Sequence, residues 1–256
     1  MQKRQIGKSG VEVSVIGLGT VKFGRNQGVK YPQAFSLPSD KEIEALLDTA
    51  EELGINLLDT APAYGTSEER LGSLLRGSRQ KWIISTKVGE EFVDGESQFD
   101  FSATYLRQSI ERSLLRLHTD YLDIVLVHSD GKDESIIENE HVFSLLAALK
   151  KEGKIRAYGM STKTIPGAKL TIDLADLVML TYNPTYTDER DMIEYAHQQH
   201  KGVLIKKAFA SGHLQMPISE MMNFVFAEPG VTSVIVGTLN KEHLRENVAS
   251  ALQALV

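Results

Sequence analysis

Short apolar runs alternate with amphipathic segments along most of the chain. The runs are brief and rich in β-branched residues, which favours buried strands over core helices. The pattern predicts eight strands, at Val15–Leu18, Asn56–Leu58, Trp82–Thr86, Tyr121–Val127, Ile155–Met160, Leu177–Thr181, Gly202–Lys206 and Ser233–Val236. Helical patterns lie between them, for example at Lys41–Leu53, Ala103–Leu117 and Val142–Lys151.

The order of these predicted elements limits the fold. Strict alternation of strand and helix implies parallel strands joined by right-handed crossovers, in a doubly wound sheet or a closed barrel. Eight units favour an α/β fold with a single (β/α)8 TIM barrel. No linker rich in Pro, Gly or Ser divides the chain, so we expect one domain over residues 1–256, with the barrel spanning 15–256. Residues 3–13 carry two strand-like pieces around a Ser-Gly turn and predict an N-terminal β-hairpin.

Composition and charge narrow the classes of function. The 256 residues are 42% hydrophobic and 24% charged, which is ordinary for a chain able to bury a large core. A formal net charge of −6 without a basic stripe argues against nucleic-acid binding, so a small-molecule partner is expected. The lack of cysteine excludes disulfides, thiolate catalysis and cysteine-based metal sites, and no metal is expected. No signal-like segment and no uninterrupted apolar stretch of about 18 residues is found, which predicts a cytoplasmic protein with no membrane partner.

Three polar residues end consecutive predicted strands. Asp59 follows the second strand, Lys87 the third and His128 the fourth. Reacting groups in a parallel barrel sit at the C-terminal ends of strands, and adjacent strands lie about 5 Å apart. A carboxylate, an ammonium and an imidazole can therefore form one cluster, over which Tyr64 can lean from the following loop. Each residue alone has an ordinary explanation as a cap, loop or packing residue, but their coincidence favours a catalytic group.

The chemistry of this set suits proton transfer. A tyrosine ionises near pH ~10, and a nearby lysine cation is expected to lower the pKa of Tyr64. Asp59 can supply the counter-charge for Lys87, while His128 can form a hydrogen bond to a carbonyl oxygen. The natural reaction gives a proton to an oxygen that becomes an alcohol, which is the protein's part in hydride transfer from a nicotinamide.

Several segments together resemble the aldo-keto reductase superfamily over nearly the whole chain. The segment Leu58–Gly65 is similar to the family signature that holds the catalytic Asp and Tyr, Ser85–Gly89 to its lysine strand, and Tyr121–His128 to its histidine strand. The spacings of 28 residues from Asp59 to Lys87 and 41 from Lys87 to His128 are also typical. The resemblance implies a (β/α)8 barrel, a nicotinamide cofactor, and reduction of aldehydes or ketones with Tyr64 as proton donor.

The same resemblance implies the cofactor contacts. They are Gly19, Thr20, Ser161, Thr162, Met179, Lys206, Ala208, Ala210, Gly212, Leu214, Gly237, Thr238, His243, Glu246 and Asn247. Three of them depart from the family pattern: Thr162 replaces the usual Asn, Met179 the usual Gln, and Lys206 the aromatic residue that stacks on nicotinamide. Only His243 remains as a basic group near a 2′-phosphate, so NADPH is expected with NADH as the alternative.

Lys206 and four loop residues are further candidates for ligand contacts in the barrel mouth. Lys206 ends the seventh predicted strand, so it either reaches solvent along its stem or meets an anion of the cofactor or substrate in the barrel mouth. The candidates for substrate contacts are Phe23, Tyr31, Phe92 and Ser129.

Two other functions remain open from the sequence. One is a nicotinamide-binding family member that senses redox state or supports a complex with little turnover, and the intact tetrad counts against it. The other is an unrelated phosphate-binding barrel isomerase, whose base would normally be a Glu or His beside a glycine-rich phosphate loop. The N-terminal hairpin and the tetrad spacings count against that reading.

Overall fold

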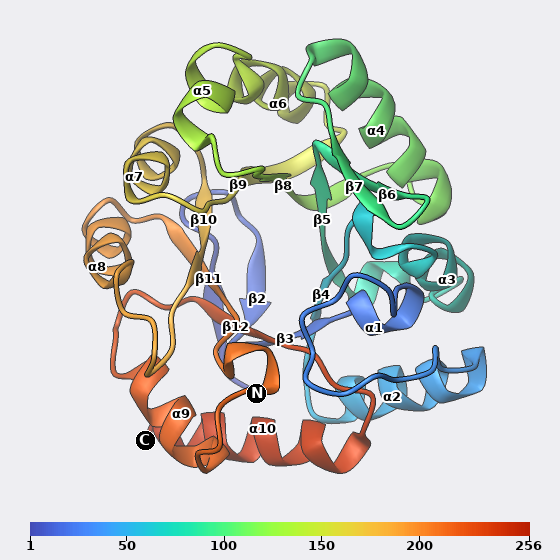
Figure 1. Ribbon diagram of the computed structural model, residues 1–256, viewed down its shortest axis with the longest axis vertical. Helices are drawn as coiled ribbons and strands as arrows, with labels where there is room; N and C mark the ends of the chain where they lie inside the picture. The colour runs from blue at the N-terminus through green and yellow to red at the C-terminus, as the bar shows by residue number, and fades with distance from the viewer.

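The computed structural model describes residues 1–256 and has a closed barrel of eight parallel strands (Figure 1). The strands are β3 (Ile16–Gly19), β4 (Leu57–Asp59), β5 (Ile83–Val88), β8 (Leu122–His128), β9 (Ile155–Ser161), β10 (Leu177–Thr181), β11 (Gly202–Lys206) and β12 (Ser233–Val236). They run around the barrel in the order β10-β11-β12-β3-β4-β5-β8-β9. The (β/α)8 prediction is confirmed, and every predicted strand is present with its ends shifted by at most two residues.

Helices form a ring around the barrel (Figure 1). The longer ones are α2 (Asp40–Glu52), α3 (Ser67–Leu74), α4 (Ala103–Arg116), α6 (Val142–Lys151), α7 (Ile165–Leu174), α8 (Arg190–Gln198), α9 (Ile218–Phe226) and α10 (Lys241–Ala254). Shorter elements are α1 (Val21–Gly24), α5 (Asp133–Glu138), and the 3₁₀ turns η1 (Pro62–Tyr64), η2 (Arg79–Lys81) and η3 (Ala210–Gly212). Helix α2 begins where Ser39 and Glu42 form a reciprocal capping box. None of the helices is both long and apolar enough to span a membrane.

The predicted N-terminal hairpin is present and closes one end of the barrel. Strands β1 (Lys3–Gln5) and β2 (Glu12–Ser14) pair antiparallel. Ile6, Val11 and Val13 are fully buried and pack with apolar side chains from inside the barrel. Burial of these apolar side chains holds the hairpin against the end of the barrel that it closes.

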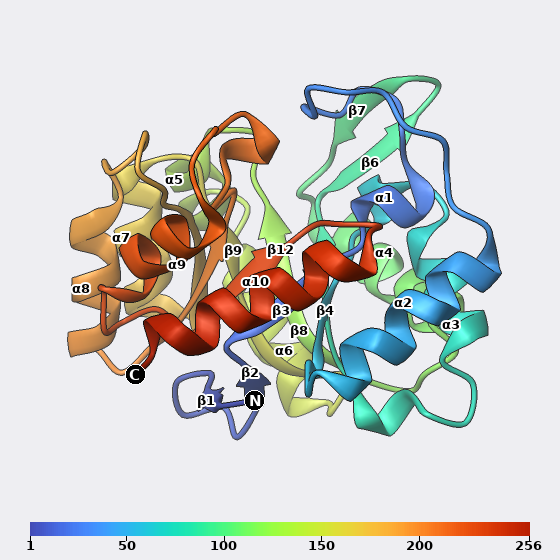
Figure 2. The same cartoon turned by 90° about the horizontal axis from the view of Figure 1, so that it is seen from below.

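A second hairpin stands at the opposite end of the barrel, directly after β5 (Figure 2). Its strands are β6 (Glu90–Val93) and β7 (Glu96–Phe99), joined through Asp94 and Gly95, which both have positive φ angles of 51° and 88°. Asp-Gly is a favoured pair for such tight turns. This hairpin was not among the predicted elements, and it brings Glu90 over the barrel mouth.

Candidate active site

The period-two alternation of the strands explains why polar side chains gather in the barrel mouth. Leu57 on β4, and Ile124 and Leu126 on β8, belong to the apolar cluster inside the barrel. Side chains two residues apart on a strand point to the same face, so Asp59 and His128 also face the interior. The apolar cluster fills the lower barrel, and these polar groups form the next layer above it.

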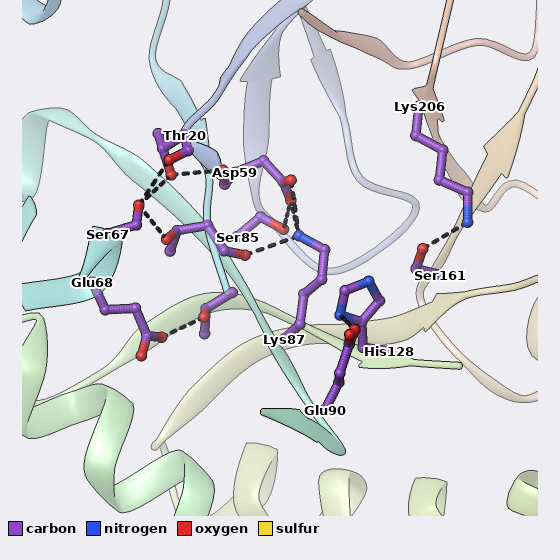
Figure 3. Close-up of polar contacts among 12 residues, drawn as sticks. Thr20, Asp59, Ser67, Glu68, Ser85, Lys87, Glu90, His128, Ser161 and Lys206 are labelled. Atoms are coloured by element: carbon purple, nitrogen blue, oxygen red, sulfur yellow. Dashed lines mark hydrogen bonds and ion pairs between the residues drawn. The ribbon is translucent and has the colours of Figure 1, made fainter. Parts of the chain in front are cut away.

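Asp59 and Lys87 form a buried ion pair in this layer (Figure 3). Lys87 Nζ donates to both carboxylate oxygens of Asp59 at 2.8 Å and to the Thr60 carbonyl oxygen at 2.9 Å. Ser85 Oγ donates to Asp59 Oδ1 at 3.0 Å. Burial lowers the pKa of Lys87, but Asp59 and Tyr64 outweigh burial and the pKa lies above its ordinary value. Lys87 is therefore a fixed ammonium ion with its donors satisfied, as a buried ion pair requires.

Tyr64 ends η1 and lies beside both Lys87 and His128. Lys87 Nζ is 4.8 Å from the centroid of the Tyr64 ring, and the Tyr64 and His128 rings meet edge to face with centroids 6.3 Å apart. Burial raises the pKa of Tyr64, and Lys87 opposes this only in part. Lys87 lowers the pKa of Tyr64 as expected, but desolvation of the phenolate has the larger effect and the net shift in the free protein is upward. Tyr64 is a neutral phenol at neutral pH and can donate its proton.

His128 has a carboxylate neighbour that the sequence did not reveal. Glu90 Oε2 lies 2.7 Å from His128 Nδ1, although the direction of this contact is poor for a hydrogen bond. Ser97 Oγ donates to the other carboxylate oxygen, Glu90 Oε1, at 2.6 Å. Burial raises the pKa of Glu90, but His128 and Ser97 outweigh it and the pKa falls to about 2. Glu90 is an anion whose two oxygens each have their own partner.

Lys206 points into the mouth from the end of β11. Its Nζ donates to Ser161 Oγ at 2.8 Å (Figure 3). It also donates to the Thr162 carbonyl oxygen at 2.8 Å, and it forms no ion pair. Burial lowers the pKa of Lys206 to about 7, and Glu189 only partly offsets this. Lys206 therefore lies in the barrel mouth as expected, and its amino group has no anionic partner within ion-pair distance.

The four residues expected to contact substrate lie in different environments. Phe23 is fully buried in the core between barrel and outer helices, and Ser129 is 1% exposed with its hydroxyl donating to Asp133. Packing around Phe23 and the hydrogen bond from Ser129 leave little of either side chain exposed in this structure, and their contact with substrate stays a prediction. Tyr31 and Phe92 remain partly exposed. The Arg25 guanidinium lies 3.4 Å above the Phe92 ring, so these two side chains form one unit.

Sequence comparison agrees with the motifs found in the chain. The family model described as Aldo/keto reductase family matches residues 15–221. The chain belongs to the aldo/keto reductase family. Members of this family are oxidoreductases that use nicotinamide cofactors and act on small carbonyl compounds.

Several relatives of this aldo-keto reductase are similar over most of its length. An uncharacterized oxidoreductase of Bacillus subtilis is 30% identical, with 98% of this chain and 91% of the relative covered. L-galactose dehydrogenase of Arabidopsis thaliana is 30% identical over 84% of this chain and 67% of that protein. Among solved structures, a proposed aldo-keto reductase from Pseudomonas aeruginosa is 53% identical with a TM-score of 0.92, covering 99% of this chain and 95% of that one. These similarities extend across the barrel and its mouth.

Most of the expected cofactor contacts of the aldo-keto reductase lie at the same end of the barrel as Asp59 and Lys87, whereas Met179 lies in the middle of β10 and packs in the apolar cluster inside the barrel. Gly19 ends β3 and Thr20 follows it, Ser161 ends β9, and Lys206 ends β11. The expected contacts in the loop after β11 are Ala208, Ala210, Gly212 and Leu214, and those after β12 are Gly237 and Thr238. His243, Glu246 and Asn247 lie on α10. The side chains of Thr20 and Met179 are 0% and 2% exposed, so this structure leaves little of either open to a ligand.

Two buried polar atoms without partners fit a nicotinamide dinucleotide. Thr162 Oγ1 and Asn247 Oδ1 have no hydrogen-bond partner, and their residues are 1% and 3% exposed. An unpaired buried polar atom is costly unless a ligand satisfies it. A nicotinamide carboxamide and an adenine amino group both carry N–H donors. The residues present therefore fit such a cofactor at both of its ends.

Proposed function

We propose that this aldo-keto reductase reduces aldehydes or ketones to alcohols with NADPH, and that Tyr64 donates the proton. The observation that carries the proposal is the contact of Lys87 with both Asp59 and the Tyr64 ring at the barrel mouth. A neutral phenol beside a fixed ammonium ion is a group that can release a proton and have the resulting phenolate stabilised.

Each residue of the tetrad has a separate task in this reaction. When bound, the reduced nicotinamide supplies a hydride to the carbonyl carbon. Tyr64 gives its proton to the carbonyl oxygen, so the product is a neutral alcohol and the side chain becomes a phenolate. Lys87 stabilises that phenolate, and Asp59 holds Lys87 in place. His128 orients the carbonyl oxygen by a hydrogen bond, and the phenolate regains its proton from solvent.

NADPH is proposed over NADH on the basis of the N-terminal end of α10. His243 lies in the first turn of this helix, where the helix dipole also favours an anion. NADH is the alternative, because no arginine fork is present among the expected contacts.

Cofactor titration followed by a carbonyl screen tests this function. The dissociation constants of NADPH and NADH are measured first, and NADPH oxidation is then followed with a generic aromatic aldehyde and a ketone. Steady turnover that depends on the aldehyde is expected. Tight nucleotide binding without turnover of any carbonyl compound would instead favour a redox-sensing role.

A further inference from the structure

Glu90 is held in one position beside His128 by contacts at both carboxylate oxygens. Oε2 lies 2.7 Å from His128 Nδ1, and Oε1 accepts the Ser97 hydroxyl across the β6–β7 hairpin at 2.6 Å. The two side chains of the pair are only 20% and 11% exposed. The charge of Arg25 also lowers the pKa of Glu90. The carboxylate is therefore charged and held close to one atom of the imidazole ring, although the contact is poorly aligned for a hydrogen bond.

Four ionisable groups face His128 from four different elements. They are Glu90 from β6, Lys87 from β5, Lys206 from β11 and Tyr64 from η1. Burial lowers the pKa of His128, Glu90 raises it, and the two lysines lower it further. Glu90 is the one neighbour that favours the imidazolium ion, so its charge decides how much of that ion forms near neutral pH.

The contact also decides which ring nitrogen carries the proton. A charged carboxylate offers only lone pairs, so a bare ring nitrogen 2.7 Å away would be repelled, and the nitrogen beside Glu90 must carry a hydrogen. Nδ1 then keeps its hydrogen in both the neutral and the charged ring. Nε2, on the far side of the ring, is bare in the neutral form and carries a hydrogen in the charged form.

We propose that Glu90 is a positioning residue that keeps a proton on Nδ1 of His128, so that Nε2 meets the substrate oxygen as a donor or an acceptor according to the charge of the ring. The consequence for catalysis rests on the proposed carbonyl reduction. A carbonyl oxygen can only accept, so it needs Nε2–H, whereas the hydroxyl of an alcohol can donate to bare Nε2. Tyr64 still transfers the proton, and His128 transfers none.

Glu90→Gln separates the charge of this residue from its shape, because the amide oxygen can still accept from Nδ1. The matched control is Glu91→Gln on the same strand, since Glu91 pairs with Arg112 at 2.8 Å and makes no contact with His128. The first measurement is a pH titration of the ¹⁵N-labelled imidazoles in the free protein, with His128 assigned by His128→Asn. This measurement needs neither cofactor nor substrate.

In the wild type, neutral His128 is expected to be the Nδ1–H tautomer. In Glu90→Gln its titration moves to lower pH, and in Glu91→Gln it stays unchanged. A neutral Nε2–H tautomer in the wild type, or equal titrations in all three proteins, would overturn the proposal. Equal shifts in both variants would overturn it too, because the hairpin and not the Glu90 charge would then be the cause.

Kinetics supply the second measurement. In Glu90→Gln, kcat/KM for carbonyl reduction at neutral pH is expected to fall about tenfold, the scale of one charge-assisted hydrogen bond, with NADPH affinity unchanged. The pH profiles of carbonyl reduction and alcohol oxidation should both move to lower pH. An equal loss of kcat/KM at every pH, with pH profiles that do not move, would contradict a positioning role for Glu90. If no protein turns over while the imidazole titration shifts as expected, the proposed function fails and the role of Glu90 stands.

Discussion

The ammonium group of Lys206 and the hydroxyl group of Ser161 lie 2.8 Å apart across the barrel mouth, joining the ends of β11 and β9. Lys206 donates its hydrogen bonds to neutral oxygens, although its charge is buried. The charges that act on it are those of Glu189, Lys207, Lys163 and Asp133. Burial lowers its pKa to about 7, so near neutral pH a fraction of the side chains is uncharged in the free protein. An arriving anion would stabilise the charged form.

Lys206→Met is expected to weaken NADPH binding by roughly 1–3 kcal/mol if the ammonium meets a cofactor phosphate. The wild-type affinity should fall as pH rises through about 7, because the free side chain then loses its proton, and binding above this pH should take up a proton. Calorimetry in buffers of different ionisation enthalpy measures the uptake, which the variant should lack. If cofactor affinity holds and only carboxylate-bearing aldehydes lose activity, the ammonium serves the substrate. No change in either would show that Lys206 contacts neither ligand and only joins the ends of β11 and β9.

Lys206 also predicts a pH dependence of stability. Its pKa in the folded protein lies below its ordinary value of 10.5, so the unfolded chain binds more protons between about pH 7 and 10.5. This residue therefore makes the free energy of unfolding rise with pH in that window, and Lys206→Met should flatten the rise. Urea unfolding of the cofactor-free proteins at several pH values is the check, and equal slopes in both would argue against a depressed pKa.

Asn247→Leu should separate stability from cofactor binding. The buried Oδ1 has no partner in the free protein, so a similarly shaped apolar side chain is expected to stabilise it by about 1 kcal/mol. NADPH affinity should fall by roughly tenfold, because a hydrogen bond to the cofactor is lost. Thermal unfolding with and without NADPH tests both statements, and a variant less stable but equally tight for NADPH would refute them.

Lys87→Met removes the cation that opposes the burial of Tyr64. The pKa of Tyr64 should rise further, and Asp59 is left buried without its ion-pair partner at a cost of about 3–5 kcal/mol. Carbonyl reduction should drop at neutral pH with a changed pH optimum. The double variant with Asp59→Asn should recover stability but not activity, which distinguishes loss of folding from loss of catalysis. An unchanged pH–rate profile in Lys87→Met would count against the effect of Lys87 on Tyr64.

Much of the fold follows from local rules in the sequence. The eight strands are short apolar runs, and the period of two along β4 and β8 places Asp59 and His128 on the same face as their apolar neighbours. The spacings then place Asp59, Lys87 and His128 on consecutive barrel strands, with Tyr64 in the turn after the first of them.

The side-chain directions and contacts that the sequence did not predict depend on tertiary packing, which local sequence patterns do not describe. Phe23 and Ser129 belong to loop or short-helix segments whose side-chain directions are set by the surrounding core and by Asp133. Glu90 reaches His128 only because an unforeseen hairpin folds back over the mouth, and an Asp-Gly turn was its one local signal. The direction of the Tyr64 pKa shift depends on burial, which the residue types alone do not give.

The most direct test of the proposed function is NADPH-dependent carbonyl reduction by Tyr64→Phe, measured beside the wild type. This change deletes the phenolic hydroxyl and keeps the ring, so the unfolding midpoint and the NADPH dissociation constant should stay close to wild type. Turnover should fall roughly 100-fold or more, the effect expected for loss of the proton donor. Near-normal turnover in a folded, NADPH-binding Tyr64→Phe protein would contradict the account.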